Sequence, residues 1–118
     1  MNATDQTGIR AIIEARAKAV HAGDVDALVT DLADGVVNYD VVDPLSREGK
    51  ASSRKRAAEW LGSYDDPPNW ENRDVQITAD GDVAFSHSLS RVTGKLRSGD
   101  EIDMWFRTTL GFRQIGGR

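Results

Sequence analysis

The stretch DVAFSHSLSRVTGKLRSGDEIDMWFRTTLGFRQI, residues 82–115, is typical of two long antiparallel strands joined by a tight turn. Residues 82–96 and 101–115 are rich in β-branched and aromatic side chains, and Ser98-Gly99 between them is a hairpin signal. With a two-residue turn, Arg91 lies opposite Phe106 and His87 lies opposite Leu110.

This register predicts which side of the hairpin faces the interior. The mainly apolar side, which we expect to pack against helices, carries Phe85, His87, Leu89, Arg91, Phe106, Thr108, Leu110 and Phe112. The other side carries Ser86, Ser88 and Ser90 with Arg107 and Thr109, and it looks outward. A bulge in either strand would exchange these faces beyond it.

Upstream of the hairpin, the sequence predicts helices first. Apolar residues recur at helical spacing over residues 5–21, and Gly23 ends this helix. Asp24 caps a second, short helix that ends at Gly35, and a third begins near Ser52 or Ser53 and ends before Pro67.

Two further strands complete the pattern. VVNYDVVDPL, residues 36–45, is a strand stopped by Pro44. Residues 70–78 form another, and the Asp-Gly pair in ADGD (79–82) favours a type I′ turn after it. Helices followed by a run of antiparallel strands predict an α+β fold with the helices on one face of a curved sheet.

The composition fits a single domain, residues 1–118, with 39% hydrophobic and 29% charged residues. The net charge of −4 argues against a nucleic-acid partner, which needs a basic stripe. There is no cysteine, and no segment has the length of a membrane span, so we expect no disulfide, no membrane insertion and a cytoplasmic location.

Charged residues stand where the pattern calls for apolar ones. Arg16 falls near the centre of the apolar stripe of the first helix, and Asp40 lies inside a predicted strand. Together with His87 and Arg91, they are expected to reach an inner space lined by apolar side chains, which is the usual character of a small-molecule site.

Each of these residues also has a structural interpretation. Asp40 can be a buried partner of Arg16, and His87 can be a core histidine bonded to a backbone carbonyl. Arg91 can reach the sheet rim, and Trp60 on the third helix can be core as well as ligand platform.

Other chemistries are not indicated. Asp43 before Pro44 is typical of a turn. Two histidines without a nearby acidic cluster predict no metal site, and no phosphate-binding loop or other cofactor motif occurs. A serine nucleophile is disfavoured because Ser86, Ser88 and Ser90 alternate with His87 along one strand.

The order of these segments resembles the NTF2-like superfamily, in its SnoaL-like and ketosteroid-isomerase-like branch. AVHAGDVDALVTDLADGVV is similar to the opening of the family, and NYDVVDPLSREGK is similar to its first strand and the following loop. GDVAFSHSLSRVTG and EIDMWFRTTLGFRQIGGR resemble its paired long strands. The resemblance covers nearly the whole chain.

The resemblance implies an α+β, cystatin-like cone in which a curved sheet wraps a long helix around a pocket, and it implies a homodimer packed through the outer sheet face. Asp40 falls where ketosteroid isomerases have their general base, and Arg16 stands where they have an oxyanion-binding tyrosine. The strand that usually follows G-G-R in this branch is missing from the sequence.

Three functions are compatible with this pattern. The first is an acid–base catalyst of isomerase, cyclase or hydratase type on a small apolar molecule, with Asp40 as base and His87 as acid/base partner. Its ligand-binding residues would be Arg16, Trp60, Arg91, Phe106 and Thr108. The others are a ligand-binding protein without turnover and a dimeric association module.

Overall fold

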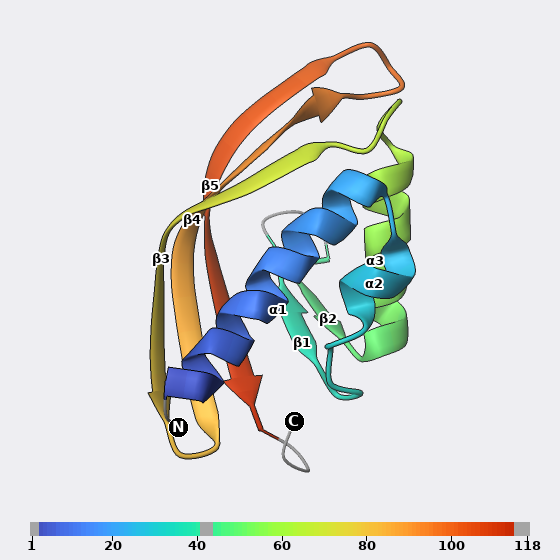
Figure 1. The fold of residues 1–118 in the computed structure, drawn as a ribbon. Helices are drawn as coiled ribbons and strands as arrows, with labels where there is room; N and C mark the ends of the chain where they lie inside the picture. Colours follow the sequence, from blue (N-terminus) through green and yellow to red (C-terminus); the bar gives the residue numbers. More distant parts are fainter. Residues whose placement is uncertain (1–2, 41–43, 115–118) are drawn as a thin grey trace.

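The computed structural model describes residues 3–40 and 44–114, and it confirms the α+β prediction: helices pack on one side of a curved antiparallel sheet (Figure 1). The helices are α1 (Ala3–Ala22), α2 (Val25–Val29) and α3 (Lys50–Gly62). The strands are β1 (Val37–Tyr39), β2 (Ser46–Glu48), β3 (Asn69–Asp80), β4 (Val83–Lys95) and β5 (Glu101–Arg113). No helix of the described residues is long and apolar enough to cross a membrane.

The first two helices follow their capping residues. Gly23 ends α1 with φ of +65°, a backbone conformation that glycine adopts without a Cβ penalty. Asp24 then caps α2 by accepting a hydrogen bond from the amide of Ala27 at 3.0 Å. The predicted extension of this second helix to Gly35 is wrong, because the α-helix ends at Val29.

The predicted strand over residues 36–45 is in fact part of a short hairpin. β1 covers only Val37–Tyr39 and pairs antiparallel with β2, with Asn38 opposite Arg47. Asn38 turns toward α3 and donates a hydrogen bond to Ser53, whereas Tyr39 is exposed. Asp43 lies outside the described residues.

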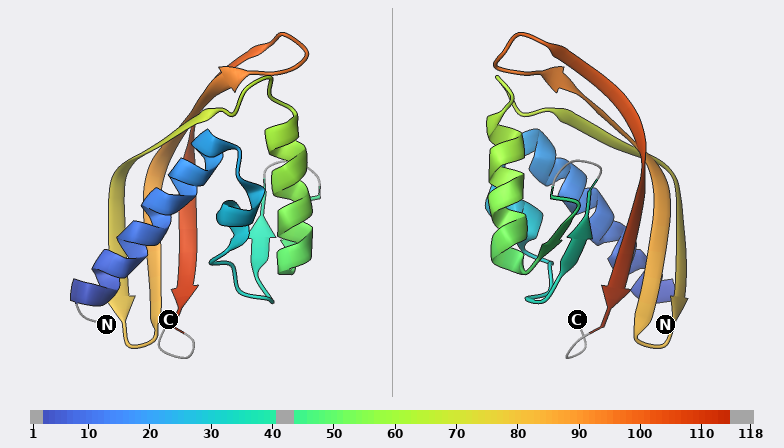
Figure 2. Two further views of the ribbon diagram at one scale, coloured as in Figure 1. Left: turned by 45° about the vertical axis from the view of Figure 1, so that its right-hand side comes forward. Right: turned by 180° about the vertical axis from the view of Figure 1, so that it is seen from behind.

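The main sheet is a meander in the order β3-β4-β5, and the β1–β2 hairpin forms a separate sheet beside it (Figure 2). Asp80 pairs with Val83, so the β3–β4 turn consists of Gly81 and Asp82. Of these two residues only Gly81 has a positive φ, which fits type II′ and not the expected type I′. A bulge interrupts β3 between Arg73 and Gln76, where Asp74 has φ of +55°.

The β4–β5 turn is longer than predicted, and this changes the faces of β4. Lys95 pairs with Glu101, so the turn comprises residues 96–100. Arg91 therefore lies opposite Trp105, one residue away from the expected Phe106. Because strand faces alternate, β4 turns Ser86 and Ser90 inward, and these are 2% and 0% exposed.

The tip of the β4–β5 hairpin is attached to the end of α3. The amide of Arg97 donates to the carbonyl of Ser63 at 2.9 Å, and its Nε donates to the carbonyl of Gly62 at 2.7 Å. The amide of Asp65 donates to Lys95 at 2.9 Å. Three hydrogen bonds thus hold the curved end of the sheet against the helix.

Two apolar clusters hold the helices on the sheet. In the first, Ile9 and Ile13 of α1 pack with Ala84 of β4 and with apolar residues of β3 and β5. In the second, Val20 and Leu28 pack with Trp60 of α3 and Trp70 of β3, among others. The aromatic residues of the second cluster lead from the core toward the candidate site.

Candidate functional site

Asp40 directly follows β1 and lies on the side of the small hairpin that faces α3. Its amide donates to the carbonyl of Leu45 at 2.8 Å, which closes the hairpin beside it. Its Oδ2 lies 3.6 Å from Nε of Arg56 on α3, and the two side chains are 36% and 31% exposed. The carboxylate is therefore half-buried next to a guanidinium group and is still reached by solvent.

Arg16 does not form the ion pair with Asp40 that the sequence suggested as a structural alternative. Its Nη1 donates to the carbonyl of Leu28 at 3.1 Å, because α2 folds back against α1 after Gly23. Burial lowers the pKa of Arg16 below its ordinary value, and the negative charge of Asp31 raises it in part. The guanidinium of Arg56, which the sequence pattern does not single out, lies 3.6 Å from the carboxylate of Asp40.

An aromatic row runs from α3 to the edge of the sheet. The ring of Trp60 lies 5.8 Å from that of Trp70, which lies 5.1 Å from that of Phe106, both pairs edge to face. Tyr64 contacts the other side of Trp60 at 5.6 Å. Trp60 and Phe106 are predicted ligand-binding residues. Trp70, which lies between them, is not among the residues that the sequence pattern predicts for the site. All three remain partly exposed on the inner side.

A chain of hydrogen bonds lies under this aromatic row. The indole Nε1 of Trp70 can only donate, and it donates to Oδ1 of Asn72 at 3.0 Å. Ser90 donates its single hydroxyl proton to the same oxygen at 3.0 Å. Thr108 must therefore donate to Ser90, at 2.7 Å. Thr108 is one of the predicted site residues, whereas the predicted register puts Ser90 on the outer face.

His87 and Arg91 lie on the outer face of the sheet, so the prediction that they point inward is wrong. The physical reason is the five-residue turn, which shifts the β4 register by one position. His87 is exposed and stacks on Phe85 with ring centroids 6.5 Å apart. Neither side chain joins Asp40 or Arg16 in the inner space.

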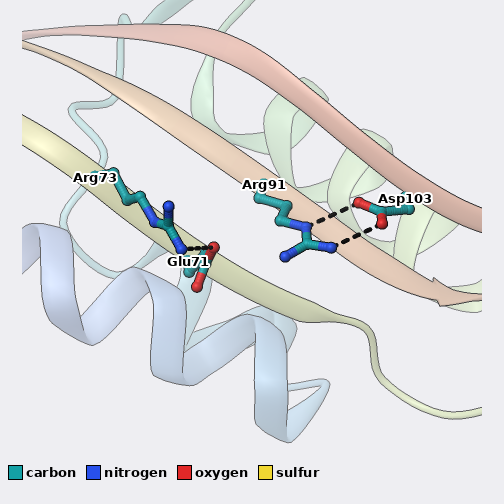
Figure 3. Close-up of polar contacts among 4 residues, drawn as sticks. All are labelled: Glu71, Arg73, Arg91 and Asp103. Carbon is teal, nitrogen blue, oxygen red and sulfur yellow. Dashed lines mark hydrogen bonds and ion pairs between the residues drawn. The ribbon is translucent and has the colours of Figure 1, made fainter.

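Arg91 instead belongs to a charged row on the outer face (Figure 3). Its Nε and Nη2 donate to the two carboxylate oxygens of Asp103 at 2.8 and 2.7 Å. These hydrogen bonds lower the pKa of Asp103 below its ordinary value. Arg91 and Arg73 also lie against the ring of Trp105, at 5.5 and 5.0 Å from its centroid.

Two clefts in the structure open on the outer side of the sheet. One of about 370 Å³ has His87, Leu89 and Arg107 among its walls. Another of about 230 Å³ lies beside the β3–β4 turn. Within residues 3–40 and 44–114, no three side chains of histidine, aspartate or glutamate gather to hold a metal ion.

The curved antiparallel sheet with helices on one side agrees with the comparison to known families. The model of the SnoaL-like domain matches residues 9–118. The chain belongs to the SnoaL-like domain family. No curated protein matches this SnoaL-like domain.

Solved structures place the SnoaL-like domain in the NTF2-like fold. An NTF2-like protein of unknown function from Pseudomonas putida is 27% identical with a TM-score of 0.88, over 100% of this chain and 82% of that one. A protein of unknown function with a cystatin-like fold from Nostoc punctiforme is 17% identical, with a TM-score of 0.82 over 100% and 86%.

A third similar structure carries an enzyme name. It is a candidate dehydratase of the NTF2-like family from Streptomyces avermitilis, 16% identical, with a TM-score of 0.82 over 98% of this chain and 90% of that one. At this identity, the likeness to this protein shows a common fold.

Proposed function

We propose that this SnoaL-like domain binds a small, largely apolar molecule between its helices and the inner face of its sheet and catalyses a proton transfer on it. The observation that carries the proposal is the position of Asp40, half-buried at the helix-facing side of the small hairpin and 3.6 Å from Arg56. Trp60 follows Arg56 by one helical turn, so an apolar wall adjoins the charged pair.

In this proposal Asp40 acts as the general base. A carboxylate that solvent and ligand can reach is able to remove a proton from a carbon next to a carbonyl group. Arg56 would stabilise the negative charge that develops on the carbonyl oxygen. His87 and Arg91 have no part in the step, since both lie on the opposite face of the sheet.

Support for this class of chemistry comes from the family. A similar fold carries the name dehydratase, and others carry the names scytalone dehydratase and polyketide cyclase, each as a candidate assignment. Dehydration and cyclisation of carbonyl compounds are reactions that a general base can promote by removing a proton. The proposed ligand is accordingly a small enone, polyketide or epoxide, the location is cytoplasmic, and no cofactor is required.

The test compares the wild type with Asp40→Asn on panels of enones, polyketides and epoxides. Removal of a general base is expected to lower turnover by about 10²-fold or more. Asp65→Asn is the matched control, because Asp65 is exposed and lies at the far end of α3. Equal turnover in wild type and Asp40→Asn excludes Asp40 as the base; binding without turnover identifies a non-catalytic binding protein.

A second candidate function is association of two copies through the outer sheet face. Phe85, Leu89 and Trp105 share this face and are 42–47% exposed, which is unusual for large apolar side chains on strands of one sheet. Light scattering after size exclusion should give a dimer, and Leu89→Asp should give a monomer. A monomeric wild type at high concentration would exclude this association.

A further inference from the structure

Arg47 on β2 holds a hydrogen-bond donor that is not satisfied within the described part of the chain. Its Nε is buried and has no hydrogen-bond partner among the described residues. Arg47 is opposite Asn38 in the hairpin, and Asn38 bonds Ser53 of α3. The guanidinium of Arg47 therefore belongs to the side of the hairpin that faces α3, the same side as Asp40.

An unpaired buried N–H requires an explanation, since native proteins pair nearly all such groups. In Arg91 of the same chain, the edge of the guanidinium formed by Nε and Nη2 binds a carboxylate. Its Nε and Nη2 hold both oxygens of the Asp103 carboxylate, at 2.8 and 2.7 Å. The equivalent edge of Arg47 has the same fork of donors, which matches a carboxylate.

Arg56 brings a second positive charge to this place. Arg56 follows Ser53 by three residues on α3, so both side chains lie on the helix face that contacts the hairpin. Its Nε is 3.6 Å from Asp40, a distance longer than a direct hydrogen bond. Arg47 and Arg56 thus bring two guanidinium groups to the region where the hairpin faces α3, on the same side as Asp40.

We propose that Arg47 and Arg56 form an anion subsite, and that the molecule bound in the inner space is a carboxylic acid with an aromatic or polycyclic body. The carboxylate occupies the fork of Arg47, and the apolar body lies against Trp60, one turn beyond Arg56. This inference rests on the proposed function, because it names the class of ligand for the same site.

The test uses 2-naphthoate and its uncharged methyl ester as probes in isothermal titration calorimetry at neutral pH. The wild type should bind the acid at least about tenfold more tightly than the ester, as a charge-assisted bidentate contact provides. Arg47→Gln should lose most of this preference, because only Arg56 then remains to attract the carboxylate. Arg47→Lys, which keeps the charge and loses the fork, should retain only part of the preference.

Arg10→Gln is the matched control, since Arg10 is exposed on α1, and it should keep the full preference. Circular dichroism melting checks that each variant is folded. Equal binding of acid and ester by the wild type, or an undiminished preference in Arg47→Gln, overturns the anion subsite and leaves the apolar pocket standing. Failure of both probes to bind overturns the pocket of the proposed function and the subsite with it.

Discussion

Replacing Ser90 by alanine will break the hydrogen-bond chain under the aromatic row at a position that water does not reach. Ser90 is 0% exposed, and its hydroxyl links Thr108 at 2.7 Å to Asn72 at 3.0 Å. Alanine leaves the Thr108 hydroxyl without its acceptor, while Asn72 keeps the indole of Trp70. We expect the free energy of unfolding to fall by about 1–3 kcal/mol.

A double-mutant cycle separates the energy of the Thr108–Ser90 hydrogen bond from general effects on packing. Thr108→Val removes only the Thr108–Ser90 hydrogen bond and should cost about 1 kcal/mol. The two single variants both lose that bond, so the double variant should be destabilised by about 0.5–1.5 kcal/mol less than their sum.

Urea unfolding followed by circular dichroism and tryptophan fluorescence measures all four proteins. Ser98→Ala, in the exposed hairpin turn, serves as control and should change stability by less than about 0.5 kcal/mol. Additive costs, within about 0.3 kcal/mol, would refute the hydrogen bond between Thr108 and Ser90.

Two further variants test packing and charge. Gly94→Ala should destabilise the protein by about 1–3 kcal/mol in thermal melts, because the added Cβ would lie 2.9 Å from the ring of Tyr64. Gly111→Ala is the control and should be neutral or slightly stabilising, because nothing lies within 4 Å of the added Cβ. Equal effects of the two substitutions would contradict the close contact at Gly94. The ion pair between Arg91 and Asp103 stabilises the fold fully above the ordinary pKa of aspartate, and this stability is lost as the pH falls through the lowered pKa of Asp103. Asp103→Asn should remove this contribution. The stability difference between wild type and Asp103→Asn should therefore vanish at strongly acidic pH in urea unfolding; a constant difference would contradict the ion pair.

The three helices, and the boundary between the first two, could be predicted because the signals are local. Gly23 and Asp24 act through their own backbone and side chain, and both have the roles that the sequence indicated. α3 begins earlier than predicted, at Lys50, because Gly49 with φ of +90° precedes it without a side-chain cap. Ser53, expected near the start of this helix, is buried within it and bonds Asn38.

The faces of β4 could not be predicted from hydrophobicity. Phe85 and Leu89 are larger and more apolar than Ser86 and Ser90, so the pattern favours the wrong side of the strand as the buried one. The structure buries the small residues because hydrogen bonds satisfy Ser90 and because the turn has five residues. The length of the β4–β5 turn, which the sequence does not reveal, determines which residues of β4 face the helices.

The candidate site was predicted in part. Asp40 lies on an inner side and Trp60, Phe106 and Thr108 line the interior as expected, whereas their roles toward a ligand stay predictions. Arg56 could not be selected, because on a helix with several exposed basic residues nothing local distinguishes it from a solvated charge. Only the position of the β1–β2 hairpin next to α3 gives it a partner.

The attachment of the β4–β5 tip to α3 would restrict how the proposed ligand enters the interior. Swinging the C-terminal end of α3 outward, as a lid would move, requires breaking the hydrogen bonds from Arg97 and Asp65. The other end of α3 begins at Lys50, just after Gly49, next to the short hairpin that carries Asp40 and Arg47. Entry from that side would leave these hydrogen bonds intact. If the ligand enters past the hairpin, the amide hydrogen of Arg97 should therefore exchange slowly with solvent while the ligand binds and leaves.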